Sequence, residues 1–199
     1  MPEEPIFYYD FSSPYSYIAA HRVDEILPIR PRWQPIAFGA LIMDIGKVPW
    51  SFDETPARDV RMRECETRAA AIGLPTKWPP GWPKETYSIV ALRAALVAEE
   101  LGKLREFSLA AFDQCLGLGE DLTDIEIVLR AADEAGVDAD AIRAGVARAE
   151  IKQRLRDVTD AARDRGVHGV PTVEWKGELF WGDDRLDAAA AAIAGTVEV

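Results

Sequence analysis

The chain has 199 residues, of which 34 are acidic, 23 are basic and 48% are hydrophobic, and its formal net charge is −11. A chain of this length buries about 70% of its unfolded surface, so it folds without a disulfide or a structural metal. The acidity excludes nucleic acid and anionic membranes as partners, because both require a basic surface.

The first forty residues predict two strands joined by a helix. The aromatic run at 6–9 is typical of a buried strand, and a second strand is expected at 33–38. Between them, Pro14 suits the first turn of a helix that continues to about Ile26. Parallel strands joined by a helix form a βαβ unit.

The middle of the chain, from about residue 55 to 165, has helical periodicity throughout. Apolar residues indicate helices near 90–97, at 104–112 and at 125–135, the last with Thr123 or Asp124 as its N-cap. Asp138 is expected to open the next helix. Residues 120–150 hold nine acids and three bases, which we interpret as a solvated helical surface.

Strand patterns return near the C-terminus. Residues 171–175 and 178–181 flank Lys176-Gly177 and predict a β-hairpin, and a final helix follows from Asp183 or Asp184. This order of strands and helices is that of thioredoxin, with a block of helices inserted between the βαβ and the ββα parts. We therefore predict an α/β fold with a thioredoxin-like βαβ…ββα core at 1–40 and 166–199, and a large all-helical insertion at 41–165.

The two cysteines, Cys65 and Cys115, lie fifty residues apart without a CxxC pair or a neighbouring histidine. This spacing indicates reduced thiols packed on helices and predicts no metal site. The N-terminus is acidic and lacks the apolar stretch of a signal peptide, so we expect a cytoplasmic protein with no membrane partner.

The junction between the first strand and the first helix reads D-F-S-S-P-Y-S-Y at 10–17. Ser13 and Ser16 stand where a redox thioredoxin carries C-P-x-C, which excludes dithiol exchange. The start of a helix still offers unpaired N–H groups and partial positive charge, so Ser13 can stabilise a sulfur anion brought by a ligand. The alternative is that Ser13 only caps the helix.

The second candidate segment is G-V-H-G-V-P-T at 166–172. Pro171 follows a glycine and a β-branched residue at a strand start, which favours a cis bond and leaves the Val170 backbone free for an extended ligand. In W-G-D-D-R at 181–185, Asp183 and Asp184 either cap a helix or hold an ammonium group. A γ-glutamyl group, with its ammonium and carboxylate, suits such a site.

These segments resemble the 2-hydroxychromene-2-carboxylate isomerases, a branch of the DsbA-like thioredoxin superfamily allied to the kappa-class glutathione transferases. The resemblance is carried by residues 9–19, 169–172 and 181–186 and extends over essentially the whole chain. It implies glutathione as an unconsumed cofactor, a role in aromatic catabolism and a homodimer.

The resemblance also implies roles for individual residues. Ser13 would position the glutathione sulfur as the catalytic residue, and Lys47 would meet a carboxylate of substrate or glutathione unless it is an ordinary loop lysine. Trp50, Trp82 and Tyr15 either wall a pocket for an aromatic substrate or pack in the core. The residues expected to bind glutathione are Val170, Pro171, Gly182, Asp183, Asp184 and Arg185.

The implied activity is a glutathione-dependent cis–trans isomerisation of an aromatic unsaturated 2-oxo acid. Glutathione thiolate adds to the conjugated alkene, the resulting single bond rotates, and elimination releases the other isomer. One alternative is a kappa-like glutathione transferase that conjugates an electrophile. Another is a non-catalytic DsbA-like binding module in which the serines merely cap the helix.

Overall fold

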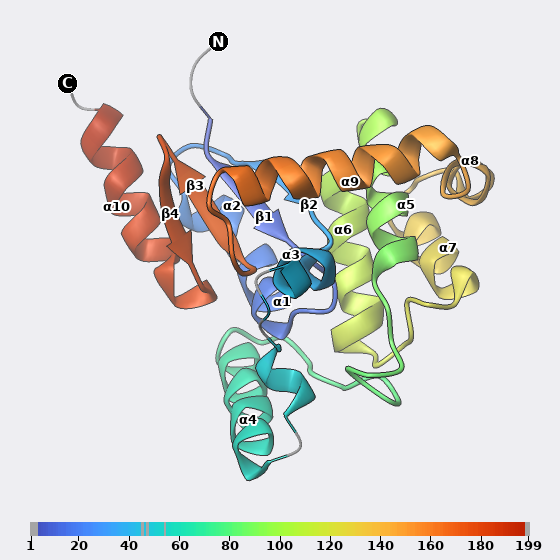
Figure 1. Ribbon diagram of the computed structural model, residues 1–199, viewed down its shortest axis with the longest axis horizontal. Helices are drawn as coiled ribbons and strands as arrows, with labels where there is room; N and C mark the ends of the chain where they lie inside the picture. The colour runs from blue at the N-terminus through green and yellow to red at the C-terminus, as the bar shows by residue number, and fades with distance from the viewer. Residues whose placement is uncertain (1–3, 45, 47, 54, 198–199) are drawn as a thin grey trace.

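A four-stranded sheet forms the centre of the molecule in the computed structural model, which describes residues 4–44, 46, 48–53 and 55–197. Its strands are β1 (Ile6–Tyr9), β2 (Arg32–Pro35), β3 (Thr172–Trp175) and β4 (Glu178–Trp181), in the order β2-β1-β3-β4 (Figure 1). β1 pairs parallel with β2 and antiparallel with β3, and β3 and β4 form the expected hairpin. The predicted thioredoxin-like fold is confirmed.

The two faces of β1 belong to different cores, because successive side chains of a strand point to opposite faces. Phe7 and Tyr9 lie in the larger cluster, with α1 (Pro14–Ala20), α5 (Ile89–Glu100), α6 (Leu104–Phe112) and α10 (Leu186–Val197). Ile6 and Tyr8 lie in a smaller cluster with α3 (Phe38–Asp44) and α9 (Ala149–Asp164).

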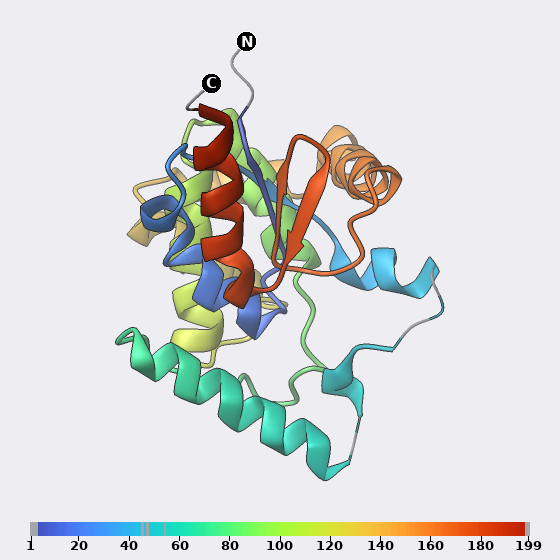
Figure 2. The same cartoon turned by 90° about the vertical axis from the view of Figure 1, so that its left-hand side faces the viewer.

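All regular structure described between β2 and β3 is helical. It includes α4 (Pro56–Ala71), α7 (Ile125–Glu134), α8 (Ala139–Gly145), a 3-10 turn at Trp50–Phe52 and a π turn at Asp113–Gly117. Helices α5 to α9 pack together beside β2, whereas α4 lies apart from them and contacts α1 and the Trp50–Phe52 turn (Figures 1 and 2). Because the sheet and α5–α9 share one core, the division of the chain at residues 41 and 166 stays a prediction.

Three boundaries differ from the predictions. The first helix stops at Ala20, and a separate α2 (Val23–Ile26) packs against α10. The second strand ends at Pro35: the Ile36 N–H still donates to the Tyr9 carbonyl at 3.0 Å, but the two N–H groups after it donate to side chains, Ala37 to Thr159 Oγ1 at 3.0 Å and Phe38 to Asp10 Oδ2 at 2.8 Å. The final helix follows a 3-10 turn at Asp183–Arg185.

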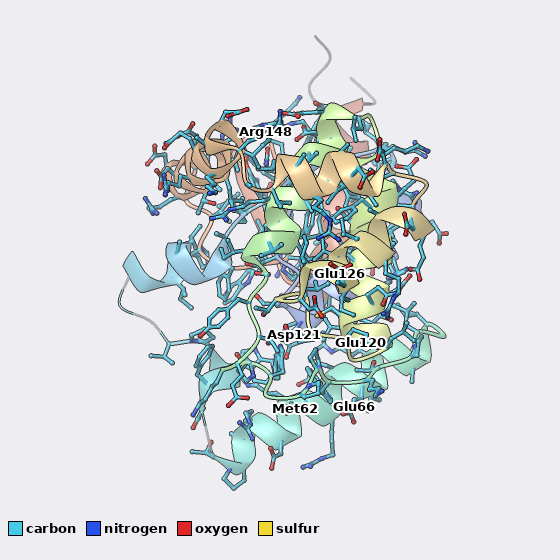
Figure 3. The ribbon with its side chains drawn as sticks, turned by 90° about the vertical axis from the view of Figure 1, so that its right-hand side faces the viewer. Met62, Glu66, Glu120, Asp121, Glu126 and Arg148 are labelled. Carbon is cyan, nitrogen blue, oxygen red and sulfur yellow. The ribbon has the colours of Figure 1, made fainter. Side chains whose placement is uncertain are left out.

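Of the two caps predicted for α7, Thr123 and Asp124, the structure has Asp124, and Asp138 caps α8 as predicted: each carboxylate accepts a backbone N–H at 2.9 Å in the first turn of its helix. The acidic residues of 120–150 lie on the outside of the helical block, and Figure 3 labels three of them, Glu120, Asp121 and Glu126. Within the described ranges, no helix combines the length and apolar character needed to cross a membrane.

Candidate active site

Ser13 joins the two candidate segments. Its hydroxyl caps α1 by accepting the Ser16 N–H at 3.2 Å, and it donates to the Val170 carbonyl at 3.3 Å. The side chain is buried but lines a cavity. Ser13 is therefore an N-cap and also the point at which the helix start meets the loop before β3.

The Val170-Pro171 peptide bond is cis, as predicted. Among the described residues, none accepts a hydrogen bond from the Val170 N–H. Pro171 O accepts the Gly182 N–H at 2.9 Å, which joins this loop to the end of β4. A side chain at Gly169 would overlap the Trp181 indole, so the close approach of these two segments requires glycine there.

Asp10 lies directly beneath the serines, and sequence reasoning gave it no role. Its carboxylate accepts the Ser12 N–H and hydroxyl at 2.9 Å and the Phe38 N–H at 2.8 Å, so it ties the serine loop to α3. Burial raises the pKa of Asp10, although these hydrogen bonds oppose the rise by favouring the charged form. The only signal in the sequence was an acid placed directly after a buried strand.

A cavity of about 720 Å³ opens above Ser13, within the usual size range of small-molecule sites. Arg185 is exposed and is not among the described lining residues. Lys47 lies outside the described residues. The predicted residues that do line the cavity are Ser13, Tyr15, Trp50, Trp82, Val170, Pro171, Gly182, Asp183 and Asp184.

Aromatic side chains form one wall. The Trp50 ring lies 6.0 Å from both Tyr15 and Trp82, measured between centroids, and the Trp82 indole N–H donates to the Ser12 carbonyl at 3.3 Å. Burial raises the pKa of Tyr15, and the neighbouring Cys65 thiol adds to the rise. Tyr15 therefore lies beside Cys65 of α4 and also lines the cavity next to Trp50.

The turn after β4 contains an ion pair that the sequence did not reveal. Asp183 is buried, and its Oδ1 lies 2.9 Å from Nη1 of Arg68 on α4. Burial raises the pKa of Asp183, and the Arg68 charge opposes that rise. Asp184 is exposed. Gly182 has a φ of +122°, and a Cβ there would overlap the Asp184 carboxylate, so this turn requires glycine.

Both cysteines are free and buried, as predicted. Burial raises the pKa of each thiol to about 12, so both are protonated at neutral pH. Neither is among the described residues that line the cavity. Because the thiolate is the reactive form, neither sulfur is suited to disulfide exchange.

Comparison with known proteins agrees with this geometry. The family model of the DSBA-like thioredoxin domain matches residues 6–194. A 2-hydroxychromene-2-carboxylate isomerase of Sphingobium xenophagum is 30% identical over 91% of this chain and 93% of its own. Glutathione S-transferase kappa 1 of Rattus norvegicus is 23% identical over 92% and 87%, respectively.

The solved structures agree in fold. That of a 2-hydroxychromene-2-carboxylate isomerase superposes with a TM-score of 0.87, covering 98% of this chain and 96% of the other at 23% identity. The likeness therefore extends over the sheet, the helical block and both candidate segments. The chain belongs to the DsbA-like thioredoxin family and, within it, to the branch of the 2-hydroxychromene-2-carboxylate isomerases.

Proposed function

We propose that this chain is a glutathione-dependent cis–trans isomerase of an aromatic unsaturated 2-oxo acid. The observation that carries the proposal is the Ser13 hydroxyl, which meets the Val170 carbonyl at the base of a cavity that neither cysteine lines. A serine replaces sulfur at the position where this fold places its reactive group. The nucleophile would therefore arrive with a ligand.

The residues of the cavity fit glutathione. The Val170 N–H, without an acceptor among the described residues, suits the cysteinyl backbone of an extended peptide. Asp184, an exposed residue that lines the same cavity, suits an ammonium group. Bound there, glutathione would supply the sulfur nucleophile that adds to the conjugated alkene and leaves it.

Ser13 would hold that sulfur in its anionic form. A free thiol has a pKa of about 8.5, and lowering it by about 1.4 units requires about 1.9 kcal/mol of preferential stabilisation. A hydrogen bond to a charged group supplies roughly 1.5–3 kcal/mol. The hydroxyl proton is held only by the 3.3 Å contact with Val170 O, so it can turn toward an anion at little cost.

The aromatic side chains that line the cavity favour an aromatic substrate. Trp50 and Trp82 present flat apolar surfaces beside Ser13, where an unsaturated acid would lie against the sulfur. The named relatives act on 2-hydroxychromene-2-carboxylate, and we infer a substrate of that class. The chain would thus select its substrate by ring stacking on one wall and place the alkene next to Ser13.

The second candidate is a kappa-like glutathione transferase, which two curated relatives favour. Ser13 would serve both reactions, so the products decide between them. Net loss of one glutathione per turnover indicates transfer, whereas constant glutathione indicates isomerisation. In the third case, a non-catalytic binding module, neither glutathione loss nor isomerisation is observed.

Calorimetry and thermal denaturation with glutathione test the proposal. A ligand present at 100 times its Kd adds about 2.7 kcal/mol to stability, which raises the Tm of a protein of this size by several degrees. We expect binding of glutathione and a weaker response to its S-methyl derivative, which cannot form a thiolate. The absence of any heat of binding and any Tm shift would refute glutathione dependence.

A further inference from the structure

The two acidic side chains after Gly182 are not equivalent. Asp183 is only 4% exposed and is already paired with Arg68, with 2.9 Å between Oδ1 and Nη1. Asp184 is exposed and lines the cavity. Since no described residue forms an ion pair with Asp184, an ammonium group of a ligand would find its carboxylate there, and Asp183 must have another role.

Arg68 has N–H donors left for a ligand besides its ion pair with Asp183. Its guanidinium lies 5.8 Å from the centre of the Tyr15 ring, and its second amino group pairs with Glu64 of the preceding helical turn. A guanidinium carries five N–H donors in one plane, so these two partners leave donors for a third. The side chain is 34% exposed and forms part of the cavity wall.

The charges around the cavity make this cation distinctive. The described residues that line it include the acids Asp10, Asp183 and Asp184, and Arg68 is the one lysine or arginine among them. Arg185, which the sequence offered as a cation, does not line it. A ligand carboxylate that binds near Asp184 would find one arginine among these lining residues, Arg68, whose remaining N–H donors it would share with Asp183 and Glu64.

We propose that Arg68 binds the α-carboxylate of the γ-glutamyl group, that Asp184 binds the neighbouring ammonium, and that Asp183 orients Arg68. This assignment rests on the proposed function, because it takes glutathione as the ligand. The planar fork of an arginine suits a carboxylate. Because Asp183 already fixes the orientation of Arg68, less side-chain entropy is lost when the ligand binds.

Calorimetric titration with truncated ligands tests the assignment. Glutaryl-cysteinylglycine keeps the carboxylate and lacks the ammonium, whereas 4-aminobutyryl-cysteinylglycine keeps the ammonium and lacks the carboxylate. For Arg68→Gln we expect roughly tenfold or greater weakening with glutathione and with the glutaryl ligand, and less than about twofold with the aminobutyryl ligand. Asp184→Asn should give the opposite pattern.

Controls separate recognition from structure. Arg63→Gln changes an exposed arginine of the same helix and should leave all three affinities unchanged. If Arg68→Gln leaves Asp183 unpaired and fails to fold, the double variant Arg68→Gln/Asp183→Asn replaces the ion pair by a neutral pair and is titrated instead. The same selective loss is then expected.

Equal weakening with both truncated ligands would overturn the assignment, because it would mean that Arg68 only supports the turn. Unchanged affinity for the glutaryl ligand would overturn it as well. Failure of the unmodified protein to bind glutathione would refute the proposed function itself, and the assignment with it. If the wild-type protein binds glutathione but Arg68→Gln gives either of these two results, the assignment of Arg68 is refuted and the proposed function is not.

Discussion

Replacing Ser13 by alanine separates its two roles, as a cap and as a donor to sulfur. Loss of an N-cap costs about 1 kcal/mol of stability, which lowers the Tm of a protein of this size by roughly 2–4 °C. The 3.3 Å bond to Val170 O is long and adds little to this. We therefore expect Ser13→Ala to fold.

The effect on turnover should be much larger. A lost hydrogen bond to the sulfur anion is worth roughly 1.5–3 kcal/mol, which is about tenfold to a hundredfold in rate at pH 7. The variant's rate should continue to rise up to about pH 9, because its bound thiol ionises near the ordinary value, whereas the wild-type rate levels off near neutrality. The pH dependence of kcat is the readout.

Ser16→Ala is the matched control. The Ser16 hydroxyl is buried and has no hydrogen-bond partner among the residues that the structure describes, so its removal should leave turnover unchanged and stability equal or slightly higher. A Ser13→Ala rate within twofold of wild type, with an unshifted pH profile, would refute the assignment of Ser13 to the sulfur.

Three further predictions concern the turn, the aromatic wall and the cysteines. Gly182→Ala should lower stability by about 1–3 kcal/mol in thermal denaturation, because alanine is strained at the positive φ of this residue. Gly195→Ala, in a helix with open space around it, should instead raise stability by up to about 1 kcal/mol. Equal effects of the two substitutions would contradict the claim that the turn at Gly182 requires glycine. Trp50→Ala should raise KM for the aromatic acid about tenfold and leave the Kd of glutathione unchanged; a weakened Kd would place Trp50 at the cofactor instead. Cys65 and Cys115 should react with a thiol reagent only after unfolding. Because folding raises both pKa values to about 12, the contribution of the thiols to stability should be constant from neutral pH to about pH 9 and fall as the pH rises above it. Fast labelling of the native protein would contradict this burial.

Local patterns were sufficient for much of the fold. The run at 6–9 and the hairpin around Lys176-Gly177 were predicted to the residue or nearly so, because a short apolar run and a two-residue turn specify their own structure. Asp138 was recognised as a cap for the same reason, and Asp124 as one of two candidates beside Thr123. The end of β2 was missed because side chains distant in the sequence, those of Thr159 and Asp10, accept the N–H groups of Ala37 and Phe38.

The site was predicted in the same uneven way. Ser13, Val170 and Gly182 stand in motifs whose residue types reveal their use, and the structure brings all three to one cavity. Arg68 stands in a helix rich in exposed charges, and its partner Asp183 comes 115 residues later. A single sequence carries no sign of such a pairing, since any of the neighbouring arginines satisfies the same local pattern.

The central claim is that glutathione takes part in the reaction and is not consumed. The direct measurement follows an aromatic unsaturated 2-oxo acid and glutathione together, with the protein at catalytic concentration, until many equivalents of substrate have reacted. We expect conversion to the other isomer only when glutathione is present, with all the thiol recovered at the end. Isomerisation at the same rate without glutathione, or loss of one glutathione for each substrate converted, would contradict it.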